Sequence, residues 1–103
     1  MLANYGFIDK NGKVVIEPQF DNVEDFSEGL AKVKKDGKWG YLDKNGKVVI
    51  ELQFDDVEDF SEGLACVKKD DKYGFIDKNG KVVIEPQFDD AEPFSEGLAK
   101  VRR

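Results

Sequence analysis

The sequence predicts an all-β fold built from three tandem repeats, and three observations lead to this prediction. A near-identical unit recurs every 34 residues: residues 5–38 and 39–72 agree at 27 of 34 positions, and residues 5–35 and 73–103 agree at 26 of 31. Short segments of each unit alternate apolar and polar residues with period two. Tight-turn pairs such as Asp36-Gly37 separate these segments. A fixed period of this size is typical of repeat proteins, whose units complete their core by stacking.

The middle unit shows the predicted strands most clearly. Residues 30–35 alternate as a half-buried strand, Asp36-Gly37 forms a two-residue turn, and residues 38–43 form a second strand rich in aromatics. Asp43 begins a turn that places Gly46 in the left-handed conformation. Residues 48–50 are a continuous apolar run and form the third strand. Each unit is therefore predicted to be a three-stranded meander.

The rest of the unit, residues 51–63, breaks the alternation. Phe54, Val57 and Phe60 stand three apart, which fits a loop containing a single helical turn that directs these side chains into the core. Gly63 is expected to take a positive φ before the next strand. In the last hairpin, Asp71 replaces the turn glycine Gly37, so that turn is expected to be less stable.

The chain is expected to be a single repeat domain, residues 1–103, with units 5–38, 39–72 and 73–103. It starts on a second strand (residues 5–9) and finishes on a first strand (residues 98–103), so its two end strands are complementary. We expect an open or head-to-tail array. The alternative is a closed threefold ring, prism-like or propeller-like, in which the last strand pairs with the first.

Charge and hydropathy restrict the partners. The net charge of −6 argues against nucleic acid. No apolar run is long enough to cross a membrane, and residues 1–4 do not resemble a signal peptide, so we expect no membrane insertion and a cytoplasmic location by default. Acidic residues concentrate in residues 17–28, 51–62 and 85–96, which contain no Lys or Arg. In-register stacking would turn this pattern into an acidic ridge and a basic ridge.

The acidic residues do not predict a metal site. The segment from Asp9 to Gly12 begins like a calcium loop, but Lys13 and Phe20 stand where such a loop needs oxygen ligands. The acidic loops, for example Asp21, Glu24 and Glu28, could bind Ca²⁺, although a solvated loop is the favoured interpretation. We predict no metal and no cofactor.

The chain is predicted not to be an enzyme, and no catalytic residue is assigned. It has no histidine, and so nothing to activate its single cysteine, Cys66. Cys66 stands where the other units have Lys32 and Lys100, which predicts an exposed and incidental thiol.

Aromatic side chains offer a possible binding face on the second strand of each unit. They are Tyr5, Phe7, Trp39, Tyr41, Tyr73 and Phe75. Packing against the neighbouring unit is the favoured interpretation, and an aromatic cage or a shelf for stacking sugars is the alternative. Gly40, between Trp39 and Tyr41, leaves room for close approach of another backbone or ring.

The unit resembles the bacterial WG repeat, also called the KWG repeat. The resemblance rests on residues 38–50, followed by Gln53-Phe54-Asp55-Asp56 and by residues 60–65, and it covers essentially the whole chain. Tyr5 and Tyr73 stand where the family has Trp. The resemblance implies β-rich repeats in variable copy number, often in large or envelope-associated bacterial proteins, and it implies no activity.

Together these observations predict a non-catalytic repeat scaffold for protein–protein interaction or self-assembly through strand edges. The alternative is a small-ligand or carbohydrate-binding module that uses the repeated aromatic residues.

Overall fold

The computed structural model describes residues 4–103 and contains only strands and turns. The strands are β1 (Tyr5–Ile8), β2 (Val14–Phe20), β3 (Asn22–Ser27), β4 (Leu30–Lys35), β5 (Lys38–Leu42), β6 (Val48–Phe54), β7 (Asp56–Val57), β8 (Leu64–Lys69), β9 (Lys72–Asp77), β10 (Val82–Phe88), β11 (Asp90–Ala91) and β12 (Val101–Arg102).

These strands form four antiparallel sheets that follow one another along the chain. Two are complete four-stranded meanders, β3-β4-β5-β6 and β7-β8-β9-β10, and the sheets at the two ends have two strands each, β1-β2 and β11-β12. The chain passes from one sheet to the next at Asp21, Asp55 and Asp89, directly after β2, β6 and β10. The predicted meander is therefore present, with a fourth strand added to it.

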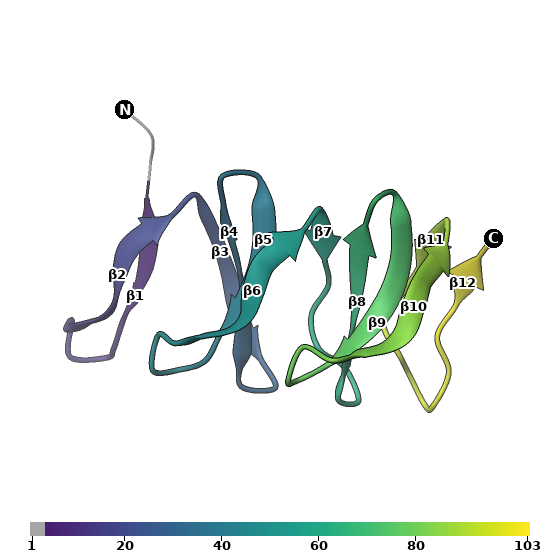
Figure 1. The fold of residues 1–103 in the computed structure, drawn as a ribbon. Helices are drawn as coiled ribbons and strands as arrows, with labels where there is room; N and C mark the ends of the chain where they lie inside the picture. The colour runs from purple at the N-terminus through teal and green to yellow at the C-terminus, as the bar shows by residue number, and fades with distance from the viewer. Residues whose placement is uncertain (1–3) are drawn as a thin grey trace.

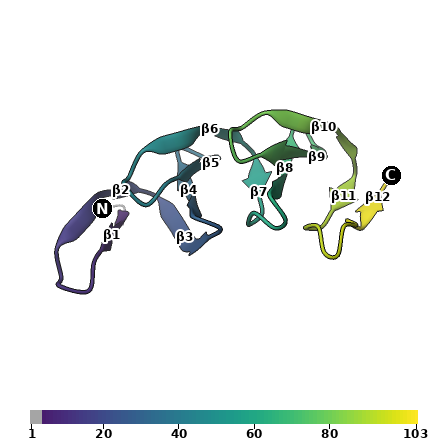
Figure 2. The same ribbon diagram turned by 90° about the horizontal axis from the view of Figure 1, so that it is seen from below.

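The array is open. Both ribbon views place β1 and β12 at opposite ends of a curved row of sheets (Figures 1 and 2). The molecule measures 44 × 31 × 18 Å along its principal axes. The expectation of an open array is met, and β12 does not return to β1 as the closed threefold alternative requires.

Predicted turns take the expected backbone conformations. Asp36 and Gly37 have φ values of 53° and 82°, which is the doubly left-handed geometry of a two-residue hairpin turn. Gly46 has a φ of 85°, and Gly63 has 79°. Asp43 holds its turn because its carboxylate accepts hydrogen bonds from the backbone N–H groups of Asn45 and Lys47 at 2.9 and 3.0 Å.

The predicted helical turn within residues 51–63 is wrong. Residues 51–54 continue the third strand as part of β6, and residues 56–57 form β7. The pairing of β5 with β6 shifts register between Trp39 and Tyr41, as in a β-bulge, and this shift bends the long strand while keeping it paired. The predicted burial of Phe54, Val57 and Phe60 is nevertheless confirmed.

Candidate functional site

Neighbouring units are joined by carboxylates that accept backbone hydrogen bonds. The Glu28 carboxylate accepts from the N–H groups of Glu62 and Gly63 at 3.1 and 3.2 Å. Glu62 repeats the contact one unit later, accepting from the N–H of Gly97 at 2.9 Å. Lys78 also forms an ion pair with Glu28, at 3.3 Å. These glutamates therefore help to set the stacking of the array.

Sequence reasoning missed this role and placed Glu28 in a solvated acidic loop. The signal was present as the Ser-Glu-Gly triplet, which recurs in every unit at residues 27–29, 61–63 and 95–97. The glutamate and glycine of each triplet both take positive φ, with values of 51° and 84° at Glu28 and Gly29. The triplet is thus a tight turn that holds a carboxylate at a fixed place on the unit surface.

Apolar contacts between units complete the stacking. Ile16 and Phe20 of β2 pack in one buried cluster with Val33 of β4 and Leu42 of β5. The serines of the first two triplets add a polar contact: the Ser27 hydroxyl donates to a carbonyl one unit away at 3.4 Å, and Ser61 does so at 2.7 Å. Each sheet therefore packs against the next through a shared apolar core.

The two terminal strands lack the neighbour that covers the inner strands. In the described part of the chain, β1 pairs only with β2, and β12 pairs only with β11. Ile8 is 68% exposed, whereas Leu42, its counterpart in β5, is 0% exposed. Val101 is 42% exposed, whereas Val33, its counterpart in β4, is 0% exposed. The two ends thus present apolar side chains that belong to the core elsewhere in the array.

The glycine after the first aromatic residue of each unit lies against the backbone of the partner strand. A Cβ built on Gly40 would lie 2.4 Å from the carbonyl oxygen of Ile50, and Gly6 and Gly74 meet the equivalent carbonyls at 2.2 and 2.4 Å. No side chain fits at such distances. The expectation of a close approach at Gly40 is confirmed, and the approaching group is backbone.

An invariant aromatic-glycine pair at a spacing of 34 residues, packed in this way, defines the repeat. The family model described as a WG-containing repeat matches residues 5–39, 39–73 and 73–103. The chain belongs to the WG repeat family. Comparison with curated proteins and with solved structures returned no significant match.

The aromatic residues of the WG units do not form one exposed face. Tyr41 and Phe75 are buried, and the Tyr41 hydroxyl donates to the carbonyl oxygen of Glu58 at 2.5 Å. Tyr41 also packs edge-on against Phe60, with ring centroids 4.8 Å apart. Phe7 makes the same kind of contact with Phe26. The second aromatic residue of each unit is therefore a packing residue.

The first aromatic residue of each WG unit is more accessible. Trp39 and Tyr73 are half-buried, and Tyr5 is 49% exposed. Lysines of the neighbouring strand lie over two of these rings: Lys34 Nζ is 5.8 Å from the Trp39 centroid, and Lys68 Nζ is 5.7 Å from that of Tyr73. Because a cation already occupies a ring face, these residues offer less surface for a stacked sugar.

The prediction that Cys66 is exposed is wrong. Its side chain is fully buried, and its thiol lies 3.7 Å from the carbonyl oxygen of Ala91. Burial raises the pKa of the Cys66 thiol to about 12, with nearby carboxylates such as Glu58 acting in the same direction. Lys32 at the corresponding position is also largely buried, with its side chain 15% exposed, and its longer side chain carries the ammonium group to Asp59, 3.2 Å away.

The predicted acidic and basic regions are in contact with each other. Lysines outside the acidic segments form ion pairs with acids inside them, including Lys38 with Asp55 and Lys72 with Asp89. The hydrogen bond from Lys38 lowers the pKa of Asp55, and that from Lys72 lowers the pKa of Asp89. Side chains of opposite sign therefore meet at these places.

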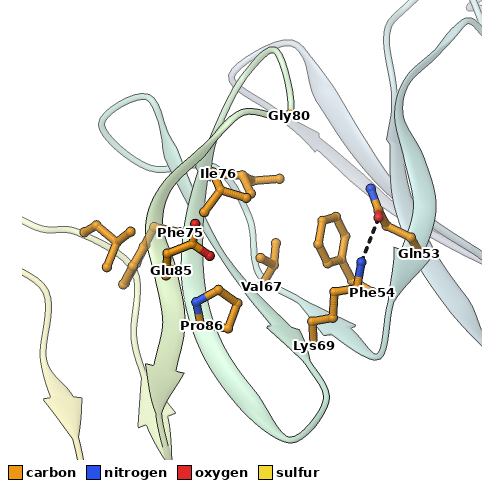
Figure 3. Close-up of a pocket in the computed structure, with 11 residues that line it drawn as sticks. Gln53, Phe54, Val67, Lys69, Phe75, Ile76, Gly80, Glu85 and Pro86 are labelled. Carbon is orange, nitrogen blue, oxygen red and sulfur yellow. Dashed lines mark hydrogen bonds between the residues drawn. The ribbon is translucent and has the colours of Figure 1, made fainter.

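A pocket of about 220 Å³ lies beside the second complete sheet (Figure 3). Its lining includes Phe54, Val67, Phe75 and Pro86, and a hydrogen bond of 3.0 Å between Lys69 Nζ and Gln53 Oε1 lies at its rim. At the equivalent place one unit earlier, Leu52 packs on the cluster of Ile16, Phe20, Val33 and Leu42. Pro86 takes the place of Leu52 here, and its smaller side chain leaves the pocket open.

Two further findings concern metals and membranes. Within residues 4–103, no three His, Cys, Asp or Glu side chains are grouped so that they could hold a metal ion. The same residues include no helix long and apolar enough to cross a membrane.

Proposed function

We propose that this chain is a non-catalytic WG-repeat scaffold that binds protein by accepting a strand at its terminal sheet edges. The observation that carries the proposal is the state of β1 and β12, each paired on one edge only within residues 4–103. An unpaired edge presents backbone N–H and C=O groups that an extended segment can satisfy. Exposed Ile8 and Val101 beside these edges supply apolar surface for the added strand.

The chemistry of the side chains supports a non-catalytic role. The chain contains no histidine, and its single thiol is buried with a pKa raised to about 12, so it is neither accessible nor ionised near neutral pH. The carboxylates of Glu28 and Glu62 accept hydrogen bonds from backbone N–H groups of the next unit, and so they serve contacts between units.

A labelled peptide with the sequence of β9, residues 72–77, tests the proposal, because β9 is the strand that pairs with β8, the internal counterpart of β12. We expect saturable binding by fluorescence polarisation. The matched control is the same peptide with alternate backbone nitrogens methylated, which removes the donors for a ladder while keeping every side chain. Equal binding of both peptides, or of neither, would refute strand addition.

The small-ligand alternative rests on the pocket in Figure 3. Its volume of about 220 Å³ is below the range of roughly 300–1,000 Å³ typical of ligand pockets. A Pro86→Leu variant restores the side chain that fills the equivalent place one unit earlier. If a glycan or small-molecule panel gives a ligand whose binding is lost in this variant, the alternative is supported over the scaffold.

A further inference from the structure

The two terminal sheets are complementary halves of one four-stranded sheet. β11 and β12 correspond to β3 and β4, and β1 and β2 correspond to β5 and β6, by the repeat of 34 residues. We infer that β12 of one copy pairs antiparallel with β1 of a second copy, so that β11-β12-β1-β2 reproduces the order β3-β4-β5-β6 found within the chain. This rests on the proposed function and names the partner as a second copy of this chain.

The internal sheet defines the register of the joint. Within the chain, Val33 pairs with Gly40, and Lys34 pairs with Trp39. Shifting these pairs along the repeat places Val101 opposite Gly6 of the second copy, and Arg102 opposite Tyr5. The cation above Trp39 is then reproduced by Arg102 above Tyr5. Each of these contacts at the joint therefore has an equivalent within the chain.

The joint buries the apolar residues that the ends expose. Leu98 and Ile8 are 78% and 68% exposed, and their internal counterparts Leu30 and Leu42 are 8% and 0% exposed. Removing such side chains from water is favourable in proportion to the apolar surface that is buried. Within the chain, a neighbouring unit covers the equivalent side chains of the inner strands. At the joint, the second copy covers the exposed side chains of both ends in the same way.

Polar groups at the two ends also match. Glu96, in the last Ser-Glu-Gly turn, is the counterpart of Glu28 and Glu62, which accept N–H bonds from the following unit. At the joint the following unit is the second copy, and its Gly29 N–H is the donor by the same repeat. The ion pair of Lys78 with Glu28 has its counterpart in Lys44 of the second copy with Glu96.

The joint is heterologous, since it uses the C-terminal edge of one copy and the N-terminal edge of the other. After pairing, each complex still has one free edge of each kind, so association continues into an open chain of copies.

Light scattering behind size exclusion, at 0.15 M salt and from micromolar to millimolar protein, tests the inference. We expect the mass to rise from 11.6 kDa through multiples of it as the concentration increases. Ile8→Lys blocks the N-terminal edge, and Val101→Lys blocks the C-terminal edge. Both positions are exposed in the single chain, so both variants are expected to fold, as circular dichroism will check.

Each blocked variant alone is expected to remain a monomer, and an equimolar mixture is expected to stop at twice the monomer mass, because only one productive joint is left. The matched control is Val48→Lys: Val48 has both neighbouring units and is still 38% exposed, so this variant should assemble like the parent.

The inference would be overturned by a parent that stays monomeric at millimolar concentration, by a mixture that gives no dimer, or by a Val48→Lys variant that fails to assemble. If the parent stays monomeric and the β9 peptide still binds, only the second-copy partner is wrong; if neither occurs, the proposed function fails as well.

Discussion

Glu28 and Gly63 are 35 residues apart in sequence and are joined by a hydrogen bond of 3.2 Å from the glycine N–H to the glutamate carboxylate. Partial desolvation raises the pKa of Glu28, but the hydrogen bonds from Gly63, Lys78 and Glu62 outweigh it, so the pKa lies below its usual value of 4.5. The ionised carboxylate is thus favoured in the folded chain and links one WG unit to the next.

Glu28→Gln is expected to lower the free energy of unfolding by about 0.5–1 kcal/mol at pH 7, a small value because the side chain is partly exposed. Because the folded pKa is depressed, this contribution is present above the usual glutamate pKa and is lost as the pH falls through the folded value. The difference between parent and variant should therefore shrink below pH 4. Urea unfolding at pH 7 and pH 3.5 measures it. Glu24→Gln, at an exposed position, is the control, and an equal effect of both variants would contradict the assignment.

Gly40→Ala is expected to destabilise the chain by about 2–4 kcal/mol, because the new Cβ would lie 2.4 Å from the Ile50 carbonyl oxygen and the bulged strand would have to move. Gly12→Ala is the comparison: its Cβ meets nothing within 4 Å, but φ is 83°, so a conformational cost of about 1 kcal/mol is expected. Thermal or urea unfolding compares the loss of stability in the two variants. A smaller loss at Gly40 than at Gly12 would show that the close approach is not what requires glycine.

Asp71→Gly is expected to stabilise the last hairpin by about 0.5–1 kcal/mol, because Asp71 holds a φ of 71° where the equivalent Gly37 takes 82° without a Cβ penalty. The reciprocal change, Gly37→Asp, should destabilise by a similar amount and serves as the matched control. Chemical unfolding of the two variants and the parent gives the comparison. If both variants were more stable than the parent, or both less stable, the turn would be ruled out as the cause.

Cys66 is expected to resist thiol reagents in the folded chain, because the side chain is buried and its pKa is raised to about 12. Modification by a colorimetric disulfide reagent at pH 8 should be at least about a hundredfold slower than in the urea-unfolded chain. Lys10→Cys in a Cys66→Ala background offers an exposed thiol as a control for reagent activity. Equal rates for folded and unfolded chains would place the thiol outside the core.

The burial of the Cys66 thiol also makes the stability of the folded chain depend on pH. The unfolded thiol ionises near its usual pKa of 9.0, whereas the folded thiol stays protonated, so its contribution to stability is complete below pH 9 and is lost as the pH rises toward the folded pKa. The buried Tyr41, whose pKa is also raised, acts in the same direction at higher pH. Urea unfolding from pH 7 to pH 10 should show a fall in stability that is smaller in Cys66→Ala. An unchanged pH profile in that variant would exclude the thiol as a source.

The sequence by itself determined the repeat, the strands and the turns, because these depend on local properties: alternation of apolar residues, the Asp-Gly pair at residues 36–37, and the conformational freedom of Gly46. Only the tertiary structure decided what depends on neighbours in space. The backbone bulge opposite Gly40 extended β6 where a helical turn was expected. Stacking placed Glu28 against the next unit and buried Cys66 where lysine stands in the other units. It also left the array open, since β1 pairs with β2 and β12 with β11, and these two sheets lie at opposite ends of the row (Figure 1).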